Sequence, residues 1–115
     1  MTAIAKETQV ALARISGGRE GALTTLAGTR GQQLSAAGLD PRTFALVKIA
    51  AMIALDAPPA SYAREINAAV QDLVTPEDIL GVLRAVAPQV GGPRVVAAAP
   101  ELMLALGLPL PESTD

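Results

Sequence analysis

The 115-residue chain contains no cysteine and no histidine. Without cysteine, these residues can form no disulfide and perform no thiol chemistry. Without histidine, they lack the commonest general base and the commonest ligand of transition metals. No run of acidic residues has the spacing of a calcium-binding loop. We therefore expect neither a metal nor a cofactor.

Aromatic residues are also scarce: Phe44 and Tyr62 are the only two, although half of the residues are hydrophobic. The core must therefore consist mainly of Ala, Leu, Val and Ile. The mean hydropathy of +0.39 is high for so small a chain. Because exposed apolar patches usually mark interfaces, we expect the chain to associate with copies of itself.

Charge and hydropathy argue against nucleic-acid and membrane partners. The net charge is −2, and the basic residues occur singly rather than in clusters. The longest apolar run, residues 44–55, contains Lys48 and is too short to span a bilayer. Lys6 and Glu7 precede any long apolar stretch, unlike a secretory signal. We expect a cytoplasmic protein.

Glycine and proline divide the chain into segments of helical length. We predict helices over residues 2–15, 19–37, 41–55, about 60–73, 76–90 and from 93 onward, the last interrupted or kinked by Pro100. Asp40-Pro41 and Thr75-Pro76 each match an N-cap followed by proline at the first helical position. No segment alternates for long with a period of two, so we predict no sheet. The fold class is all-α, with about six helices in one domain over 1–107 and a flexible tail over 108–115.

Two of these helices have patterns that predict their burial. Residues 44–55 are apolar on almost every side, which is typical of a helix buried all round. In the helix that starts at Pro76, the residues expected to face the core are Ile79, Leu80, Leu83 and Val86.

Three stretches then follow one another in a characteristic order: residues 39–43 (LDPRT), 74–79 (VTPEDI) and 87–93 (APQVGGP). Over roughly residues 39–99 the chain resembles the carboxymuconolactone decarboxylase family, whose relatives include the alkylhydroperoxidase D-type peroxidases. The resemblance implies a bundle built on a helical hairpin. It also implies a homo-oligomer, commonly a trimer or a hexamer.

The resemblance further implies positions for the Glu, the Cys-x-x-Cys and the His of the peroxidase branch. The Glu position corresponds to Ala45. An ungapped count back from residues 74–76 puts the two Cys and the His at Pro58, Ser61 and Glu65; a one-residue slip puts them at Ala57, Ala60 and Arg64. Neither register supplies a thiol or an imidazole, so disulfide-linked peroxide reduction is excluded.

The decarboxylase branch needs no Cys, and other residues could replace its chemistry. A cation must bind the substrate carboxylate, and an acid must protonate the carbanion or enolate that remains. The candidate catalytic residues are Glu65 and Tyr62, which are three apart in the chain; the candidate substrate-binding residues are Arg64, Ser61 and Lys48. Arg64 points about 100° away from Glu65 on a helix.

Each candidate also has an ordinary structural interpretation. Glu65 fits a solvated residue on an amphipathic helix, and Arg64 fits a surface or interface residue. Lys48 fits a side chain that snorkels from an apolar helix, and Tyr62 fits a packed ring. Arg94, near the start of the last helix, fits either an anion contact or a lone surface arginine.

Two functions follow from these interpretations. The first is a diverged binding or structural oligomer, which has kept the scaffold and lost the catalytic groups; we favour it because fold does not carry function. The second is an enzyme with a rebuilt acid/base site, such as a decarboxylase, isomerase or cyclase, whose ligand is a small cyclic or aromatic acid. A cavity in which Glu65, Tyr62 and a cation converge would favour the second. A third interpretation is that only the helical architecture is shared.

Overall fold

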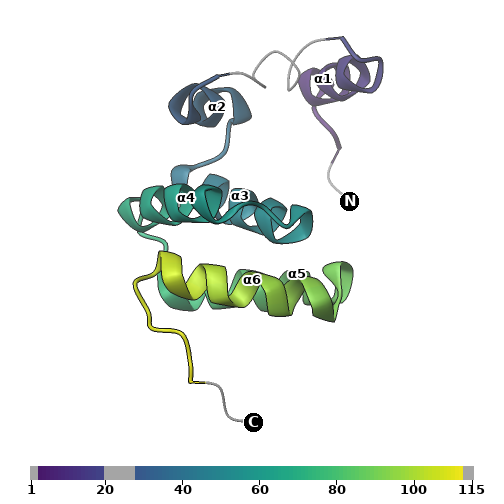
Figure 1. Cartoon of the computed structure of the whole chain (residues 1–115). Helices are drawn as coiled ribbons and strands as arrows, with labels where there is room; N and C mark the ends of the chain where they lie inside the picture. The colour runs from purple at the N-terminus through teal and green to yellow at the C-terminus, as the bar shows by residue number, and fades with distance from the viewer. Residues whose placement is uncertain (1–2, 20–27, 113–115) are drawn as a thin grey trace. The chain divides into compact units, whose positions relative to one another are not determined.

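The computed structural model describes residues 3–19 and 28–112, and all regular structure in these ranges is helical. The helices are α1 (Lys6–Ser16), α2 (Arg30–Ala37), α3 (Pro41–Leu55), α4 (Pro59–Gln71), α5 (Pro76–Val90) and α6 (Gly92–Ala105) (Figure 1). The predicted all-α fold of about six helices is confirmed for the described residues.

The chain forms two compact units, residues 1–40 and 41–115. The first unit holds α1 and α2, neither of which has a buried residue. The second unit holds α3 to α6 and contains the core. The predicted domain over 1–107 and the tail over 108–115 remain predictions.

The helix predicted over residues 19–37 is wrong at its centre; its 20–27 portion lies outside the described residues. Thr29 is the N-cap of α2. The Gln32 backbone N–H donates to the Thr29 hydroxyl at 3.2 Å, and the Thr29 N–H donates to the Gln32 side chain at 2.8 Å. This reciprocal capping box starts α2 at Arg30, whereas the prediction had a helix continuing through Gly28 and Thr29. The last helix was predicted to be interrupted or kinked by Pro100. Pro100 lies inside α6, which continues beyond it to Ala105.

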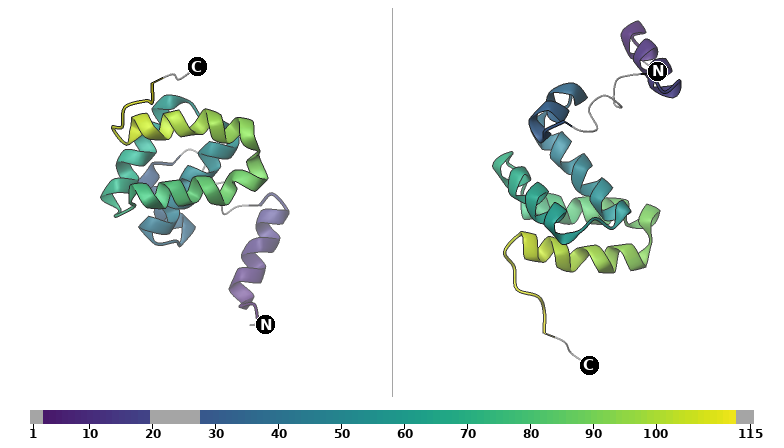
Figure 2. Two further views of the ribbon diagram at one scale, coloured as in Figure 1. Left: turned by 90° about the horizontal axis from the view of Figure 1, so that it is seen from below. Right: turned by 45° about the horizontal axis from the view of Figure 1, so that its top comes forward.

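Two helical hairpins form the second unit. In Figure 1, α3 and α4 make one layer, and α5 and α6 make the layer beneath it. The left view of Figure 2 shows α5 and α6 side by side and joined at one end. α3 packs on α5 and α6, and α4 packs on α6. The main cluster of the core contains small and aliphatic side chains and one tyrosine: Ala45, Ile49, Ile53, Tyr62, Ile66, Ala69, Val74, Ile79, Ala98 and Leu102. Phe44 is also buried.

The connection from α3 to α4 is short because α3 ends in a tight left-handed turn. Asp56 adopts a φ of 53°, and the Ala57 N–H donates to the Met52 carbonyl oxygen at 3.1 Å. This pattern is a Schellman motif, which satisfies carbonyls in the last turn of a helix. Leu73 ends α4 in the same way, with a φ of 66°. The first of these turns brings the start of α4 back to the end of α3.

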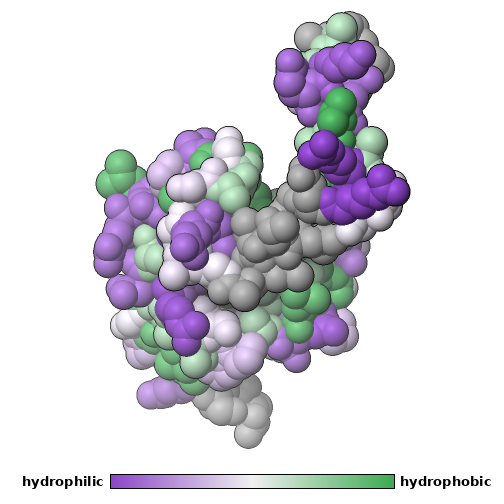
Figure 3. Space-filling model, turned by 90° about the horizontal axis from the view of Figure 1, so that it is seen from above, coloured by the Kyte–Doolittle hydropathy of each residue, from purple (hydrophilic) through white to green (hydrophobic). Residues whose placement is uncertain are grey.

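Several apolar residues that were predicted to be buried lie at the surface. α3 is not buried all round, because Val47 and Leu55 are exposed. Leu80, predicted to face the core from α5, is 45% exposed, whereas its neighbour Ile79 is buried. The reason is geometric: in a unit of two layered hairpins, each helix keeps one side that no other helix covers. Figure 3 shows hydrophobic residues at the surface among hydrophilic ones.

Across residues 3–19 and 28–112, no helix has both the length and the hydropathy needed to cross a membrane.

Candidate functional site

Helix α4 positions the two predicted catalytic side chains. It begins at Pro59, and its buried residues are Tyr62, Glu65, Ile66 and Ala69. Spacings of three, four and seven residues place all four on one side of a helix. Tyr62 and Glu65 therefore lie on the same inward face of α4.

The hydroxyl of Tyr62 is held by the backbone of α3. The side chain is only 1% exposed, and the hydroxyl donates to the Met52 carbonyl oxygen at 3.1 Å. Burial raises the pKa of Tyr62 above its ordinary value of 10.0, and the negative charges of Asp56 and Glu101 raise it further, while Arg94 opposes them. The phenol is therefore a weaker acid than in water, and its proton points toward a peptide carbonyl.

Asp56 and Arg94, two of the charged residues that act on the pKa of Tyr62, form an ion pair. Arg94 Nη1 of α6 is 3.6 Å from Asp56 Oδ2 at the end of α3, and both side chains are substantially exposed. Arg94 is therefore not a lone surface arginine. Sequence reasoning missed Asp56 and Glu101. Glu101 lies seven residues after Arg94, on the same side of α6, and this spacing could have identified it.

Glu65 is buried, with 5% exposure, so its interpretation as a solvated residue is wrong. A buried carboxylate is costly unless it is hydrogen-bonded or paired. Glu65 does take part in a polar or electrostatic interaction within the chain. In the described part of the chain, no fully buried side-chain nitrogen or oxygen lacks a hydrogen-bond partner.

The three candidate substrate-binding residues have different environments. Arg64 is exposed on the outward side of α4, away from Glu65. Lys48 of α3 is half-buried, and its ammonium nitrogen lies 5.2 Å from the centroid of the Phe44 ring, within cation–π range. Ser61 is half-buried in the first turn of α4.

The two alignment registers place the Cys and His of the peroxidase branch on residues with different burial. The ungapped register places the two Cys on exposed Pro58 and half-buried Ser61, and the His on buried Glu65. The slipped register places the two Cys on half-buried Ala57 and exposed Ala60, and the His on exposed Arg64. A site shielded from water needs inward-facing positions. At the His position the ungapped register meets this requirement and the slipped register does not, whereas at the first Cys position the reverse holds.

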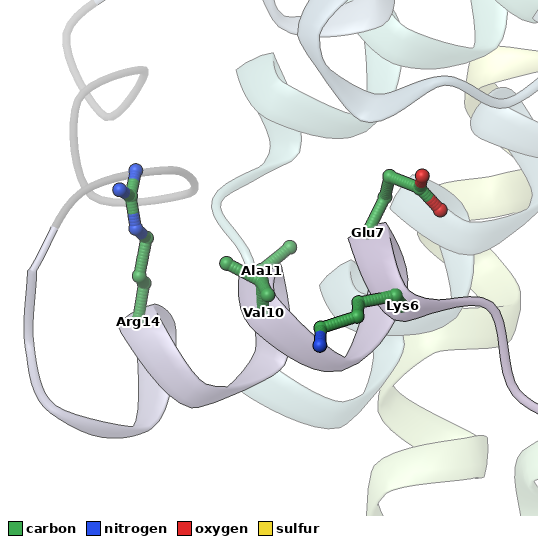
Figure 4. Close-up of a pocket in the computed structure, with 5 residues that line it drawn as sticks. All are labelled: Lys6, Glu7, Val10, Ala11 and Arg14. Carbon is green, nitrogen blue, oxygen red and sulfur yellow. The ribbon is translucent and has the colours of Figure 1, made fainter.

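Two hollows of the described surface lie elsewhere. One, of about 390 Å³, lies between α5 and α6 and is lined by Pro76, Glu77, Ile79, Leu80, Leu83, Ala99, Leu102, Met103, Leu106 and Leu108. The other, also about 390 Å³, runs along α1 and is lined by residues of that helix alone: Lys6, Glu7, Val10, Ala11 and Arg14 (Figure 4). None of the predicted site residues lines either hollow.

Comparison with known proteins identifies the family. No curated protein and no solved structure matches the chain. The model of the carboxymuconolactone decarboxylase family matches residues 20–102, well over half of the chain, a range that includes α2 to α5 and most of α6. Helix α1 lies outside the matched range. The resemblance inferred from residues 39–99 is confirmed, and the chain belongs to the carboxymuconolactone decarboxylase family.

Proposed function

We propose that this chain is a diverged member of its family that works, without a cofactor and in the cytoplasm, as a binding or structural homo-oligomer. The observation that carries the proposal is the hydrogen bond from the buried Tyr62 hydroxyl to the Met52 carbonyl oxygen. A general acid must deliver its proton to the substrate. Here the proton is directed at the backbone, and the raised pKa of Tyr62 opposes its release.

Composition supports the loss of thiol peroxidase activity. None of the 115 residues is a cysteine. A thiol peroxidase needs a thiolate to attack the peroxide and a second thiol to resolve the product. These residues supply neither group.

Exposed aliphatic side chains support self-association. In the second unit, Val47, Leu55, Leu73, Val96 and Leu104 are each more than half exposed. Full burial of a large aliphatic side chain contributes about 1.5–3 kcal/mol. The part of each side chain that is still exposed would contribute its share of that figure in an interface. A trimer or a hexamer, the assemblies implied by the family, would provide such interfaces.

The second candidate function is an enzyme with a rebuilt acid/base site, and the burial of Glu65 is the observation that favours it. Glu65 lies on the same face of α4 as Tyr62, and the ungapped register places the family's His at Glu65. In this function Glu65 and Tyr62 transfer the proton, and Arg64, Ser61 or Lys48 binds the carboxylate of a small cyclic or aromatic acid.

One assay distinguishes the two candidates: release of carbon dioxide from carboxymuconolactone, compared with a protein-free control. We expect no release above the control from the wild-type chain. Turnover that is lost in Y62F and E65Q, but kept in N67A, would establish the enzyme instead. Asn67 is an exposed residue of α4, so N67A is the matched control. Circular dichroism must show that all three variants stay folded.

Sedimentation velocity tests the homo-oligomer. We expect the wild-type chain to sediment as a trimer or a hexamer at micromolar concentration. A clean monomer at that concentration contradicts the proposed assembly.

A further inference from the structure

The outward side of α5 carries a short row of residues with opposite charges at its two ends. Glu77 and Arg84 are seven residues apart, about two helical turns, so they lie on nearly the same side of the helix. Leu80 and Gly81 lie between them. All four residues are exposed, and Leu80 keeps 45% of its surface in water.

Gly81 has no packing role inside the chain. A Cβ atom built on Gly81 meets nothing within 4 Å. Glycine within a helix destabilises it by about 1 kcal/mol relative to alanine. The absence of a side chain at this exposed position would be useful where a second backbone approaches α5 closely.

The row borders an apolar groove. The hollow of about 390 Å³ between α5 and α6 is lined by Glu77 and Leu80 of the row, and by side chains such as Leu83, Met103 and Leu106. Burial of this aliphatic surface would supply the driving force for association. Charges beside such a surface contribute more to register and orientation than to affinity.

Antiparallel pairing makes this row complementary to itself. The midpoint between Glu77 and Arg84 falls between Leu80 and Gly81. A two-fold axis at that point brings Glu77 of each copy opposite Arg84 of the other copy. Parallel pairing in register would instead set like charges opposite each other, which is destabilising.

We propose that the row of Glu77, Leu80, Gly81 and Arg84, with the adjoining groove, is a self-complementary interface in which α5 pairs antiparallel with α5 of a second copy. The inference rests on the proposed homo-oligomer and specifies one of its interfaces. Because closed assemblies with two-fold axes contain an even number of chains, it selects the hexamer over the trimer.

Charge reversal tests the interface. In E77R and in R84E, both symmetry-related contacts change from attractive to repulsive at once. We expect the dissociation constant of the wild-type assembly to rise about 10- to 100-fold in each variant. The double variant E77R/R84E restores opposite charges, so we expect it to assemble with nearly the wild-type constant. An equimolar mixture of E77R and R84E should also assemble, because one chain then carries two positive charges and the other two negative charges.

Sedimentation velocity over a concentration series measures these constants, and circular dichroism with thermal melting checks the fold of each variant. The matched control is R19E, a charge reversal at an exposed position of the first unit; it should sediment like the wild type. Single variants that assemble like the wild type overturn the interface and leave the homo-oligomer standing. A failure of both the double variant and the mixture to reassemble overturns the antiparallel arrangement. An R19E effect as large as that of R84E also overturns the interface, whereas a monomeric wild type overturns the homo-oligomer itself.

Discussion

Replacing Tyr62 by phenylalanine removes one hydroxyl and leaves the ring in the core. The hydroxyl is the donor of a single hydrogen bond, to the Met52 carbonyl oxygen at 3.1 Å. A typical intramolecular hydrogen bond contributes about 0.5–1.5 kcal/mol to stability. A larger loss arises when the remaining partner is left buried and unsatisfied.

The Met52 oxygen is not left unsatisfied in Y62F, because it also accepts the Ala57 N–H at 3.1 Å. We therefore expect Y62F to lose about 1 kcal/mol of unfolding free energy, within the range for one hydrogen bond. For a domain of about 60–100 residues, this corresponds to a decrease in Tm of about 4–8 °C.

The assay is urea and thermal denaturation followed by circular dichroism, at one protein concentration for all variants. The comparison variant is Y62A, which removes the ring from a 1%-exposed site and should lose about 3–5 kcal/mol. If Y62F is as stable as the wild type, the hydrogen bond contributes nothing. If Y62F is as unstable as Y62A, the hydroxyl has a larger role than a single bond to Met52, and the reasoning fails.

Three further predictions follow from the local geometry. Because burial raises the pKa of Tyr62, the chain's only tyrosine, its phenolate absorbance should appear at higher pH in the native chain than in urea. Unfolding free energy should then stay level up to about pH 10 and decline as the pH rises through the native pKa; Y62F should lack this decline. The backbone hydrogen bond from Thr75 lowers the pKa of Asp78, with help from Arg42, so this carboxylate should stabilise the fold above pH 3.8 and lose its effect as the pH falls through the native pKa. If the loss of stability at acid pH is the same in D78N as in the wild type, this role of Asp78 is contradicted. T75A, which removes the cap, should lose about 1 kcal/mol of unfolding free energy. Finally, Leu73 adopts a left-handed conformation, which costs a non-glycine residue about 1–2 kcal/mol. L73G should relieve this cost and be at least as stable as the wild type. L73A, which cannot relieve it, should not be more stable than the wild type.

Local signals in the sequence were sufficient to predict where several of the helices begin. Thr75-Pro76 predicted the start of α5, and the structure confirms a capping box between Thr75 and Asp78. The proline at residue 41 correctly predicted the start of α3. Such signals are reliable because a cap is satisfied by residues within one turn of the helix end. Their order along the chain was also enough to identify the family.

The candidate site depended on contacts that no local pattern contains. The burial of Glu65 depends on which side of α4 is covered, and a Glu beside Tyr62 and Ile66 is equally compatible with the edge of a polar face. The Tyr62–Met52 hydrogen bond spans two helices. The pairing of Asp56 with Arg94 depends on how the end of α3 meets the start of α6.

The exposure of apolar side chains also depended on the tertiary structure. The sequence by itself determined which residues are apolar, and therefore that α3 and α5 have more apolar surface than one narrow stripe. The packing of the helices decided which part of that apolar surface is covered by other helices. Ile79 is buried while Leu80 lies at the surface, because adjacent helical residues point about 100° apart and the layered hairpins cover only one side of each helix.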